Sequence, residues 1–486
     1  MSELSAPTPA LDTPAPALRR GALGLRHAVV ISVAVMSPAA SIFFNTIPQA
    51  GLVGAAVPLC YVVGFVIALL VASQYSELSR ELPSSGSAYT FVTEGLGRPW
   101  GFLTGWIGLI AVALGAPYSF ILMSTNLETL VQRWFGLNLH WSFWFVLAIG
   151  FVFALCYLGV RQSLSVDMTL LAFEMGICLV LALIVLLSVG SHGGLTAAPF
   201  NPNQVPANGD LTVGIILAVL SFIGFETAAA LGEETRKPHR NIPRAVFGSM
   251  VVVGVFYVLM AYVATVGYGL NKMVSGYAND QAPFDTISRA FGNPLLASLI
   301  DLAGVLSFFG AALAIINGGS RILYTVGRDG LLPRWTTIMH AKRQTPVGAI
   351  IGLCLCGLVG GIGLGFWLKP VNAFAFLGTL DALFVMLIYL LTNIACIRFF
   401  WRKRRSQFSI VRHGIFPVLS ALLITAIFLA AFLSPGQAPL NVIPYIVAVW
   451  VALGAVGIYV LREKMAAEPA GSQGDGDLRM GEEAGD

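Results

Sequence analysis

Long apolar runs separated by short polar segments make up most of the chain. A helix needs about 20 mostly apolar residues to cross the hydrocarbon core of a bilayer, and twelve such runs occur in the 486 residues. They begin near Val29, Val53, Trp100, Trp141, Met168, Leu211, Pro243, Pro294, Pro346, Val371, Gly414 and Val442. This pattern predicts an all-α polytopic membrane protein with twelve transmembrane helices.

The two ends of the chain differ from this hydrophobic region. Residues 1–27 are rich in Pro, Ala and Thr, and they lack the basic start and short apolar core of a cleavable signal. Residues 463–486 are rich in Ala, Gly, Glu and Asp. Because both stretches contain few large apolar side chains that could build a packed core, we expect them to be disordered cytoplasmic tails.

Composition narrows the class of protein further. Hydrophobic residues make up 57% of the chain and charged residues only 11%, which excludes an ordinary water-soluble enzyme and an intrinsically disordered chain. The net charge of +4 is small and gives no reason to expect a nucleic-acid partner. Histidine and cysteine show no metal-ligand spacing, so no metal or cofactor is expected. The expected partners are the lipid bilayer and a small-molecule substrate.

The basic residues indicate how the helices are oriented. With twelve crossings both termini lie on one side of the membrane, and 24 of the 28 Lys and Arg residues fall in segments assigned to that side. Only Arg133, Lys272, Arg289 and Lys369 fall on the other side. Because cytoplasmic loops are enriched in Lys and Arg, we expect both termini to be cytoplasmic and the protein to lie in the plasma membrane.

Two of the predicted helices contain residues that interrupt helical geometry. The first contains SPAAS (37–41), in which Pro38 lacks an N–H and disfavours a helical conformation of the residue before it. The sixth contains SFIGFE (221–226), with Gly224 close to the ionisable Glu226. Alone, the first feature could be a tolerated proline kink and the second a close contact between helices.

Interruptions in the first and sixth helices together indicate two inverted repeats of five helices, a LeuT-like arrangement with a central binding site. The repeats would comprise residues 28–190 and 211–398, and two further helices would lie in residues 414–462. Free amides after the first break would attract a carboxylate, and carbonyls before each break would attract an amine or a cation. The residues expected to bind substrate are Ser37, Ala39, Ala40, Ser41, Ile42, Phe222, Ile223, Gly224 and Phe225.

Three longer motifs occur in order along the chain. They are ELSRELPSSGSAYTFVTEGLGRPWGFLTGW (77–106), SFIGFETAAALGEETRKPHRNIPRA (221–245) and SRILYTVGRDGLLP (320–333). The first resembles the loop between helices 2 and 3 of the amino acid/polyamine/organocation (APC) permease family, and the others resemble its helix 6 region and the end of its helix 8. The resemblance covers nearly the whole hydrophobic region. It implies the fold and role of a secondary transporter, without fixing the substrate.

The chain departs from the family pattern at several positions. Many members have a Gly-Ser-Gly break in helix 1, whereas SPAAS (37–41) looks more like the break of putrescine-type importers. Many proton-coupled relatives have a Lys in helix 5 where this chain has Glu174. Agmatine-type exchangers have an aromatic gate at the position where this chain has Leu220. The acidic residue of the helix 6 motif is present in this chain as Glu226.

Four acidic residues lie within the predicted spans, and we expect no Lys or Arg at comparable depth. These acids are Glu174, Glu226, Asp301 and Asp381. Since a charged Asp at the bilayer centre costs about 2.5–3.5 kcal/mol, unpaired acids should face the interior of the bundle. There they would bind a proton, a sodium ion or a cationic substrate. We assign coupling or charge pairing to Glu174, Glu226, Ser307 and Asp381.

The remaining charged positions are expected nearer to water. Asp301 is placed near the outer end of helix 8, and Asp167 is placed at the cytoplasmic boundary of helix 5, where it would be solvated. Mixed charges follow helices 6 and 8 in EETRKPHRN (233–241) and GRDG (327–330). They would form either an inner gate or solvated loop charges that only orient the protein.

The sequence therefore predicts a secondary active transporter for an amino acid or related amine, coupled to protons and working by alternating access. The alternatives are a polyamine or cationic amine importer and a sodium-coupled or exchange-mode transporter. A channel is a remote alternative, because the spans show no rings of polar residues. A transport-inactive nutrient receptor is also a remote alternative, because both tails are short. An enzyme is not expected, because no paired nucleophile and base occurs at membrane depth. The sequence gives no indication of the oligomeric state.

Overall fold

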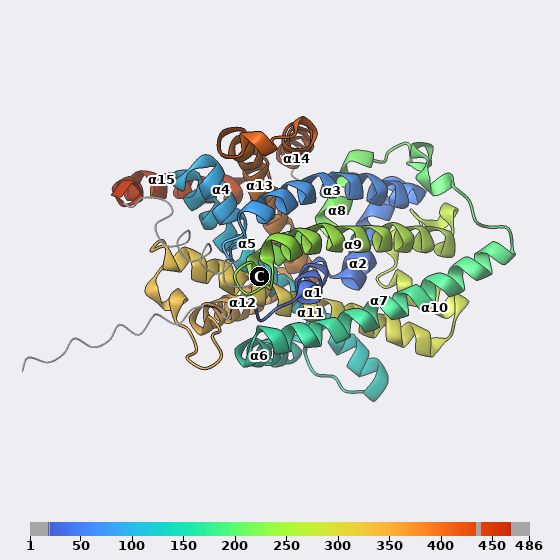
Figure 1. The fold of residues 1–486 in the computed structure, drawn as a ribbon. Helices are drawn as coiled ribbons and strands as arrows, with labels where there is room; N and C mark the ends of the chain where they lie inside the picture. Colours follow the sequence, from blue (N-terminus) through green and yellow to red (C-terminus); the bar gives the residue numbers. More distant parts are fainter. Residues whose placement is uncertain (1–17, 19, 434–438, 468–486) are drawn as a thin grey trace, which may run out of the picture.

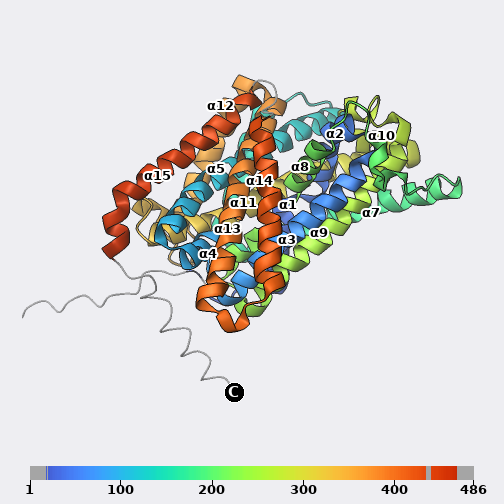
Figure 2. The ribbon, with the colours of Figure 1, turned by 90° about the horizontal axis from the view of Figure 1, so that it is seen from above.

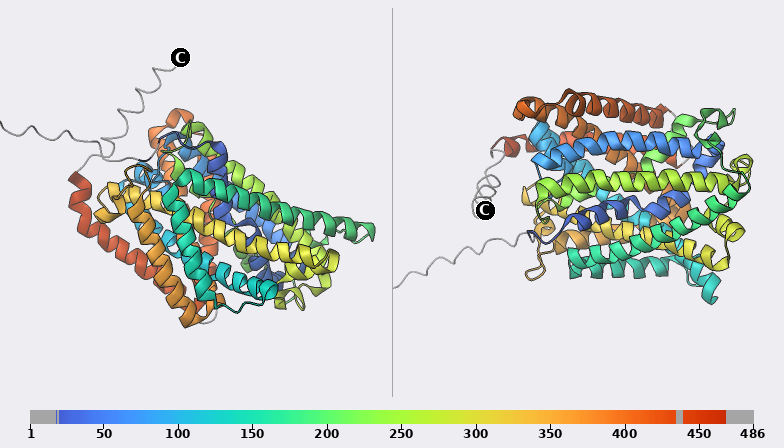
Figure 3. Two further views of the ribbon diagram at one scale, coloured as in Figure 1. Left: turned by 90° about the horizontal axis from the view of Figure 1, so that it is seen from below. Right: turned by 45° about the vertical axis from the view of Figure 1, so that its right-hand side comes forward.

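The computed structural model describes residue 18, residues 20–433 and residues 439–467. These residues form a bundle of long helices that run side by side (Figures 1 and 3). The helices of the first half are α1 (Leu25–Met36), α2 (Pro38–Val53), α3 (Val57–Glu81), α4 (Ala88–Leu96), α5 (Arg98–Phe135), α6 (Trp141–Leu158) and α7 (Val160–Ser191). Those of the second half are α8 (Leu211–Ser221), α9 (Pro238–Tyr268), α10 (Pro283–Phe291), α11 (Pro294–Arg328), α12 (Val347–Leu368), α13 (Pro370–Lys403), α14 (Phe416–Leu433) and α15 (Ile443–Ala467).

The all-helical prediction is confirmed for the described part of the chain. It contains eleven helical segments that are long and apolar enough to cross a membrane. The first segment, Leu25–Glu81, has 57 residues and comprises α1, α2, the short 3₁₀ helix η1 (Gly54–Ala56) and α3. Since one crossing needs about 20 residues, this segment is long enough to cross twice.

The helix α7 begins earlier than the apolar run indicates. We expected a start near Met168, but α7 begins at Val160, directly after Gly159. Gly159 has φ 125°, which glycine adopts without a steric cost from a Cβ. The polar residues that follow therefore form the first turns of the helix instead of a loop. Asp167 lies inside the helix and is fully buried, so the expectation that it is solvated is wrong.

The expected interruption of the first helix lies at Ser37. α1 ends at Met36 and α2 begins at Pro38, while Ser37 has φ 46° and ψ 71°. This left-handed conformation is uncommon for a residue with a Cβ. Pro38 can begin α2 because the first turn of a helix does not use the backbone N–H that proline lacks. The sequence thus breaks the helix and restarts it within a single residue.

The sixth predicted helix is also interrupted. α8 ends at Ser221, and the chain continues after a short turn as the 3₁₀ helix η4 (Phe225–Leu231). Gly224 in this turn has φ 120°. A Cβ at Gly224 would clash with Val35 of α1, so glycine is required both by the backbone conformation and by the close approach of α1. The two interrupted helices are therefore in contact near their breaks.

Two arginines lie inside helices, and one of them pairs with an acid of the predicted spans, which corrects the expectation that these acids lack basic partners. Arg133 Nη1 near the end of α5 lies 2.5 Å from Asp301 Oδ2 of α11 and 3.4 Å from Asp285 Oδ1 of α10. Arg321, assigned to a loop from the apolar runs, lies inside α11 because that helix continues to Arg328. Asp301 therefore has a basic partner, and the set of unpaired acids is smaller than expected.

The ends of the helical region differ slightly from the predicted limits. α1 begins at Leu25, inside the range expected as a tail, and Leu23 forms an isolated parallel bridge with Thr235. At the other end α15 continues to Ala467. The expected tails at 1–17 and 468–486 lie outside the described residues. α14 lies at the upper edge of the bundle in Figure 1, and α15 lies at its left edge in Figure 2. α14 packs on α3 and α13, and α15 packs on α5.

Candidate functional site

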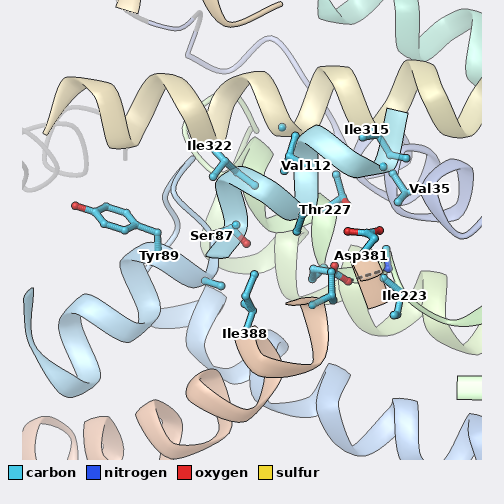
Figure 4. Close-up of a pocket in the computed structure, with 18 of the residues that line it drawn as sticks. Val35, Ser87, Tyr89, Val112, Ile223, Thr227, Ile315, Ile322, Asp381 and Ile388 are labelled. Atoms are coloured by element: carbon cyan, nitrogen blue, oxygen red, sulfur yellow. Dashed lines mark hydrogen bonds between the residues drawn. The ribbon is translucent and has the colours of Figure 1, made fainter. Parts of the chain in front are cut away.

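A cavity of about 110 Å³ lies next to both helix interruptions. A single water molecule needs only about 10–15 Å³ of such space, so the cavity is large enough for a small molecule. Figure 4 shows Tyr89 at one end of the cavity and Asp381 with Ile223 at the other. Its polar lining residues are Tyr75, Ser87, Tyr89, Thr104, Tyr118, Glu226, Thr227 and Asp381.

A row of small residues on α5 makes room for the cavity. Gly105, Gly108, Ala111 and Gly115 all line it. They are spaced three or four residues apart, so they lie on one face of the helix. Larger side chains at these positions would fill the space between α5 and the helices α11 and α13.

The carboxyl group of Glu226 lies at the interruption of the sixth predicted helix. Its Oε2 accepts a hydrogen bond from the Gly224 N–H at 3.0 Å and another from the Tyr389 hydroxyl of α13 at 2.7 Å. The interruption exposes the backbone N–H of Gly224, which an unbroken helix would pair with a carbonyl. Both hydrogen bonds stabilise negative charge on the Glu226 carboxyl. The break thus creates a site where a carboxylate is held in a fixed position.

A second carboxyl group, that of Asp381, lines the same cavity. Asp381 is buried on α13, its Oδ1 has no hydrogen-bond partner among the described residues, and Tyr118 of α5 is close enough to interact with the carboxyl group. Glu226 is close enough to interact with it electrostatically. No Lys, Arg or His is found among the described residues that line the cavity. Because two neighbouring carboxylates repel each other in a medium of low polarity, the cavity favours a bound cation or proton.

Only part of the predicted substrate-binding set lines this cavity. Ile223 and Gly224 do, and so do Glu226 and Asp381 from the predicted coupling set. Phe222 and Phe225 point into aromatic clusters instead. Phe222 packs against Tyr61, Phe65 and Tyr257. Phe225 packs against Tyr75 and Tyr389. The residues after the first break lie outside the lining of the cavity. They are Ser37, Ala39, Ala40, Ser41 and Ile42.

The backbone groups at the two breaks have partners within the protein. The Tyr257 hydroxyl of α9 lies 2.5 Å from the carbonyl oxygen of Met36 and 3.0 Å from that of Ser221, the last residues of α1 and α8. The Ser41 hydroxyl also donates to the Met36 carbonyl, at 2.8 Å. The carbonyls expected to bind an amine or a cation are therefore occupied by hydroxyl groups.

Glu174 and Ser307 lie together outside the cavity, beside α2. The Ser307 hydroxyl of α11 accepts a hydrogen bond from the Ala40 N–H at 3.2 Å and lies close to the carboxyl group of Glu174 on α7. Ala40 is in the first turn of α2, so one of the amides expected to bind a substrate carboxylate is occupied by Ser307. Two members of the predicted coupling set thus form a separate cluster.

Charged groups connect the segments that follow the sixth and eighth predicted helices. Glu233 forms two hydrogen bonds with Arg328, at 3.1 and 3.2 Å, and the Tyr89 hydroxyl donates to Asp329 Oδ2 at 2.6 Å. Burial, together with the nearby Asp329 carboxylate, raises the pKa of the Tyr89 phenol, so the hydroxyl remains protonated and acts as the donor. Because Tyr89 lines one end of the cavity, this network lies at that end.

The tyrosines that surround the two carboxyl groups were not predicted from the sequence. Tyr75, Tyr118 and Tyr389 come from α3, α5 and α13. The Tyr389 hydroxyl donates to Glu226, and Tyr118 lies close to the carboxyl group of Asp381. Tyr389 could have been predicted, because it follows Asp381 by eight residues and so lies on nearly the same helix face. The other two come from separate helices, and only the packing of the bundle places them here.

Alanine at Gly224 is expected to destabilise the protein by about 1–3 kcal/mol, because it combines a strained positive φ with a clash against Val35. The measurement is thermal unfolding of the purified protein in detergent. Gly248→Ala on α9 is the control, since nothing lies within 4 Å of a Cβ there. Equal melting temperatures for the two variants would contradict the role assigned to Gly224.

Comparison with known proteins identifies the family. The amino acid permease family matches residues 23–456. The branched-chain amino acid permease BcaP of Lactococcus lactis is 27% identical over 76% of this chain and 80% of the relative. BcaP of Bacillus subtilis is 25% identical over 63% of this chain and 67% of the relative. The low-affinity putrescine importer PlaP of Escherichia coli is 25% identical over 80% of this chain and 83% of the relative.

The family match covers nearly all of the helical region, and the apolar helices fit a multi-pass membrane protein. The resemblance drawn from the three motifs is therefore confirmed. The chain belongs to the amino acid permease family of the APC superfamily.

Proposed function

We propose that the protein is a secondary active transporter that binds a small amino acid or related amine in the cavity between Glu226 and Asp381. The observation that supports this most strongly is a cavity lined by two carboxyl groups and, among the described residues, by no basic side chain. An ammonium group bound there would relieve the repulsion between the carboxylates and donate hydrogen bonds to both of them. The named relatives transport branched-chain amino acids and putrescine, whose shared chemical group is an amine.

A cargo with two cationic groups is the second candidate. Glu226 and Asp381 offer one carboxyl group to each of two ammonium groups, and the tyrosines Tyr75 and Tyr118 present aromatic rings to the cavity. Any amino acid would also need donors for its own carboxylate, and a neutral one would bring only one cationic group for the two carboxyl groups. The Ala40 amide, expected in that role, is bound to Ser307. These contacts favour a diamine or a cationic amino acid over a neutral amino acid.

A thermal-stability screen of the purified protein against amino acids and polyamines tests both candidates. A ligand at a hundred times its Kd stabilises the folded state by about 2.7 kcal/mol, which raises the melting temperature. We expect putrescine or lysine to give the largest increase. A larger increase with leucine or valine would overturn the cationic candidate, and no increase with any amine would contradict the proposed function.

The proposed architecture has twelve crossings. The segment Leu25–Glu81 would cross twice and each of the other ten segments once, which places both termini on the same side. The distribution of Lys and Arg supports a cytoplasmic position for both ends and insertion in the plasma membrane. Breaks at Ser37 and near Gly224 fall in the first helix of each proposed repeat, 28–190 and 211–398, and support a LeuT-like pair of inverted repeats.

Transport would proceed by alternating access. Transmembrane helices 1, 2, 6 and 7, which are α1–α2, α3, α8–η4 and α9, would rock against helices 3, 4, 8 and 9, which are α5, α6, α11 and α12. This motion would expose the cavity to each side of the membrane in turn. The Glu233–Arg328 pair and the Tyr89–Asp329 hydrogen bond lie at one end of the cavity and would form the inner gate. Each of these contacts joins residues far apart in the chain, so opening the cavity at this end would separate them.

We further propose that a proton gradient drives transport, through Glu226 or Glu174. Among the described residues, neither of these two carboxyl groups is paired with a basic side chain. This supports the proposal, because binding one proton changes the charge of such a group. The test is uptake into proteoliposomes under a pH gradient or under a sodium gradient. Accumulation that requires the pH gradient is expected, and accumulation that follows only the sodium gradient would contradict proton coupling.

A further inference from the structure

A second cavity, of about 500 Å³, opens where α3 and α13 end and the chain turns into α14. It is separate from the cavity of Glu226 and Asp381, because the two share no lining residue. Part of its wall is the π-helical turn η9 (Val411–Ile415), a type of turn that is frequent at functional sites. Charged and polar side chains make up nearly all of the lining, so the site suits a charged ligand. The lining residues are Glu77, Arg80, Glu81, Phe400, Gln407, Ser409, Arg412 and His413.

The chain around this cavity carries an excess of positive charge. Residues 398–412 contain six Lys and Arg residues and no Asp or Glu. Three of the six pair with acids of α3 and α4. The pairs are Glu77 with Arg412, Glu81 with Arg404 and Glu94 with Lys403. Because the basic residues of this segment outnumber these acids, the local potential attracts an anion.

The two guanidinium groups in the lining are held loosely. Arg80 Nη1 lies 3.6 Å from Glu77 Oε2, and Arg412 Nη1 lies 3.4 Å from Glu77 Oε1. A charge-assisted N–H···O hydrogen bond measures about 2.7–2.9 Å, so both contacts are long. The side chains of Arg80 and Arg412 are 50% and 60% exposed. Both groups can therefore turn to an anion in the cavity without breaking a strong ion pair.

His413 can balance the Glu77 carboxylate when the arginines turn away. Its ring lies flat on Phe400, with 3.7 Å between the ring centroids, and the residue is 3% exposed. The Ser409 N–H donates to Nδ1 at 3.0 Å, which places the proton of the neutral ring on Nε2. Nε2 has no hydrogen-bond partner among the described residues and lies 3.5 Å from Glu77 Oε2. A small movement of Glu77 toward the ring would complete this hydrogen bond.

Apolar side chains beside the cavity indicate that its ligand comes from the bilayer. Trp401, Ile410 and Val411 are all exposed, and the Arg405 guanidinium lies 5.2 Å from the centre of the Trp401 ring. Tryptophan is enriched at the membrane interface, and clusters of Lys and Arg directly after a transmembrane helix bind anionic headgroups. A phospholipid could place its phosphate in the cavity and its acyl chains against the apolar side chains.

We propose that this cavity binds the phosphate group of an anionic phospholipid of the cytoplasmic leaflet through Arg80 and Arg412, while His413 takes over the Glu77 carboxylate. The inference rests on the proposed cytoplasmic position of the termini, and it does not depend on the identity of the cargo. α3 belongs to the group of helices proposed to rock, whereas α13 and α14 do not. A lipid bound between them would favour one arrangement of the two groups and so regulate transport.

The test is the melting temperature of the purified protein in detergent, measured as dioleoylphosphatidylglycerol is added. We expect a saturable increase with this lipid. The increases with dioleoylphosphatidylcholine, which carries no net charge, and with inorganic phosphate, which has no acyl chains, should be much smaller. Equal increases with the two lipids would overturn the anionic ligand, and an equal increase with inorganic phosphate would overturn the lipid as its source. No cargo is needed, so failure here leaves the transport function standing.

The double variant Arg80→Gln, Arg412→Gln should bind the lipid about 25-fold more weakly, because each basic side chain near an anionic surface contributes about a factor of five. Arg402→Gln, Arg405→Gln is the matched control, since it removes the same charge from outside the lining. In about 0.15 M salt, charges more than about 8 Å away are largely screened, so the control should stay within about threefold of the wild type. Equal affinities of the two double variants would overturn the site.

The role of His413 has its own test. His413→Phe keeps a ring on Phe400 and removes the donor, and it should weaken lipid binding about tenfold, the value of a hydrogen bond to a charged group. Adding Glu77→Gln removes the charge that His413 would balance, so the affinity should return. Wild-type affinity of His413→Phe, or no recovery in the double variant, would overturn this role.

Discussion

Replacing Glu226 with glutamine is expected to lower the efficiency of amine transport, kcat/KM, by about 30-fold or more. Glutamine preserves the size of the side chain and can still accept the Gly224 and Tyr389 hydrogen bonds that Glu226 accepts. It removes only the negative charge. Losing one member of a buried charge pair costs about 2–5 kcal/mol, and every 1.4 kcal/mol, roughly, is a factor of ten. The measurement is the rate of uptake of labelled cargo as a function of cargo concentration.

Glu128→Gln supplies the control for this prediction. It makes the same chemical change on α5, near the end of the helix and outside the cavity lining. Uptake by this variant should match that of the wild type. If Glu226→Gln also transported at the wild-type rate, the carboxyl group of Glu226 would not bind the cargo, and the proposed binding site would be wrong.

Replacing Arg321 with methionine is expected to destabilise the fold by about 3–5 kcal/mol. Arg321 and Glu234 are both about 1% exposed and are joined by a charge-assisted hydrogen bond. The pair connects α11 to the segment after η4, which also holds Leu23 through backbone hydrogen bonds. Methionine leaves the Glu234 carboxylate buried without its counter-charge. The measurement is the melting temperature and the yield of folded protein in detergent.

A double variant distinguishes loss of the ion pair from loss of packing. In Arg321→Met with Glu234→Met neither charge remains buried, so most of the lost stability should return. A double variant as unstable as Arg321→Met alone would mean that shape, and not charge, makes this contact important. A single variant as stable as the wild type would show that Arg321 is not needed to balance Glu234.

The main features of the fold follow from local patterns in the sequence. Apolar runs of spanning length located nearly all the helices, since a bilayer requires continuous apolar segments with internally paired backbones. The break at Ser37 followed from the proline after it, and the break at Gly224 from a glycine beside an acid. These are short-range effects, so one sequence is sufficient to predict them.

The contents of the site depend on packing between distant helices and were predicted less completely. The sequence placed Asp167 and Arg321 near water because polar residues surround them, yet both are buried where helices extend past their apolar runs. Pairing of Arg133 with Asp301 joins residues 168 positions apart. Likewise, Tyr257 reaches the carbonyls of both breaks from a third helix. No periodicity within one helix predicts such contacts.

Transport, as proposed, requires that the two carboxyl groups of the cavity bind an amine cargo. The most direct measurement is uptake of labelled putrescine, lysine and leucine into proteoliposomes that contain either the wild type or the double variant Glu226→Gln, Asp381→Asn. The account predicts saturable uptake of at least one of these compounds by the wild type and uptake no greater than that of protein-free liposomes by the double variant. Equal uptake by both proteins, or none by the wild type, would contradict it.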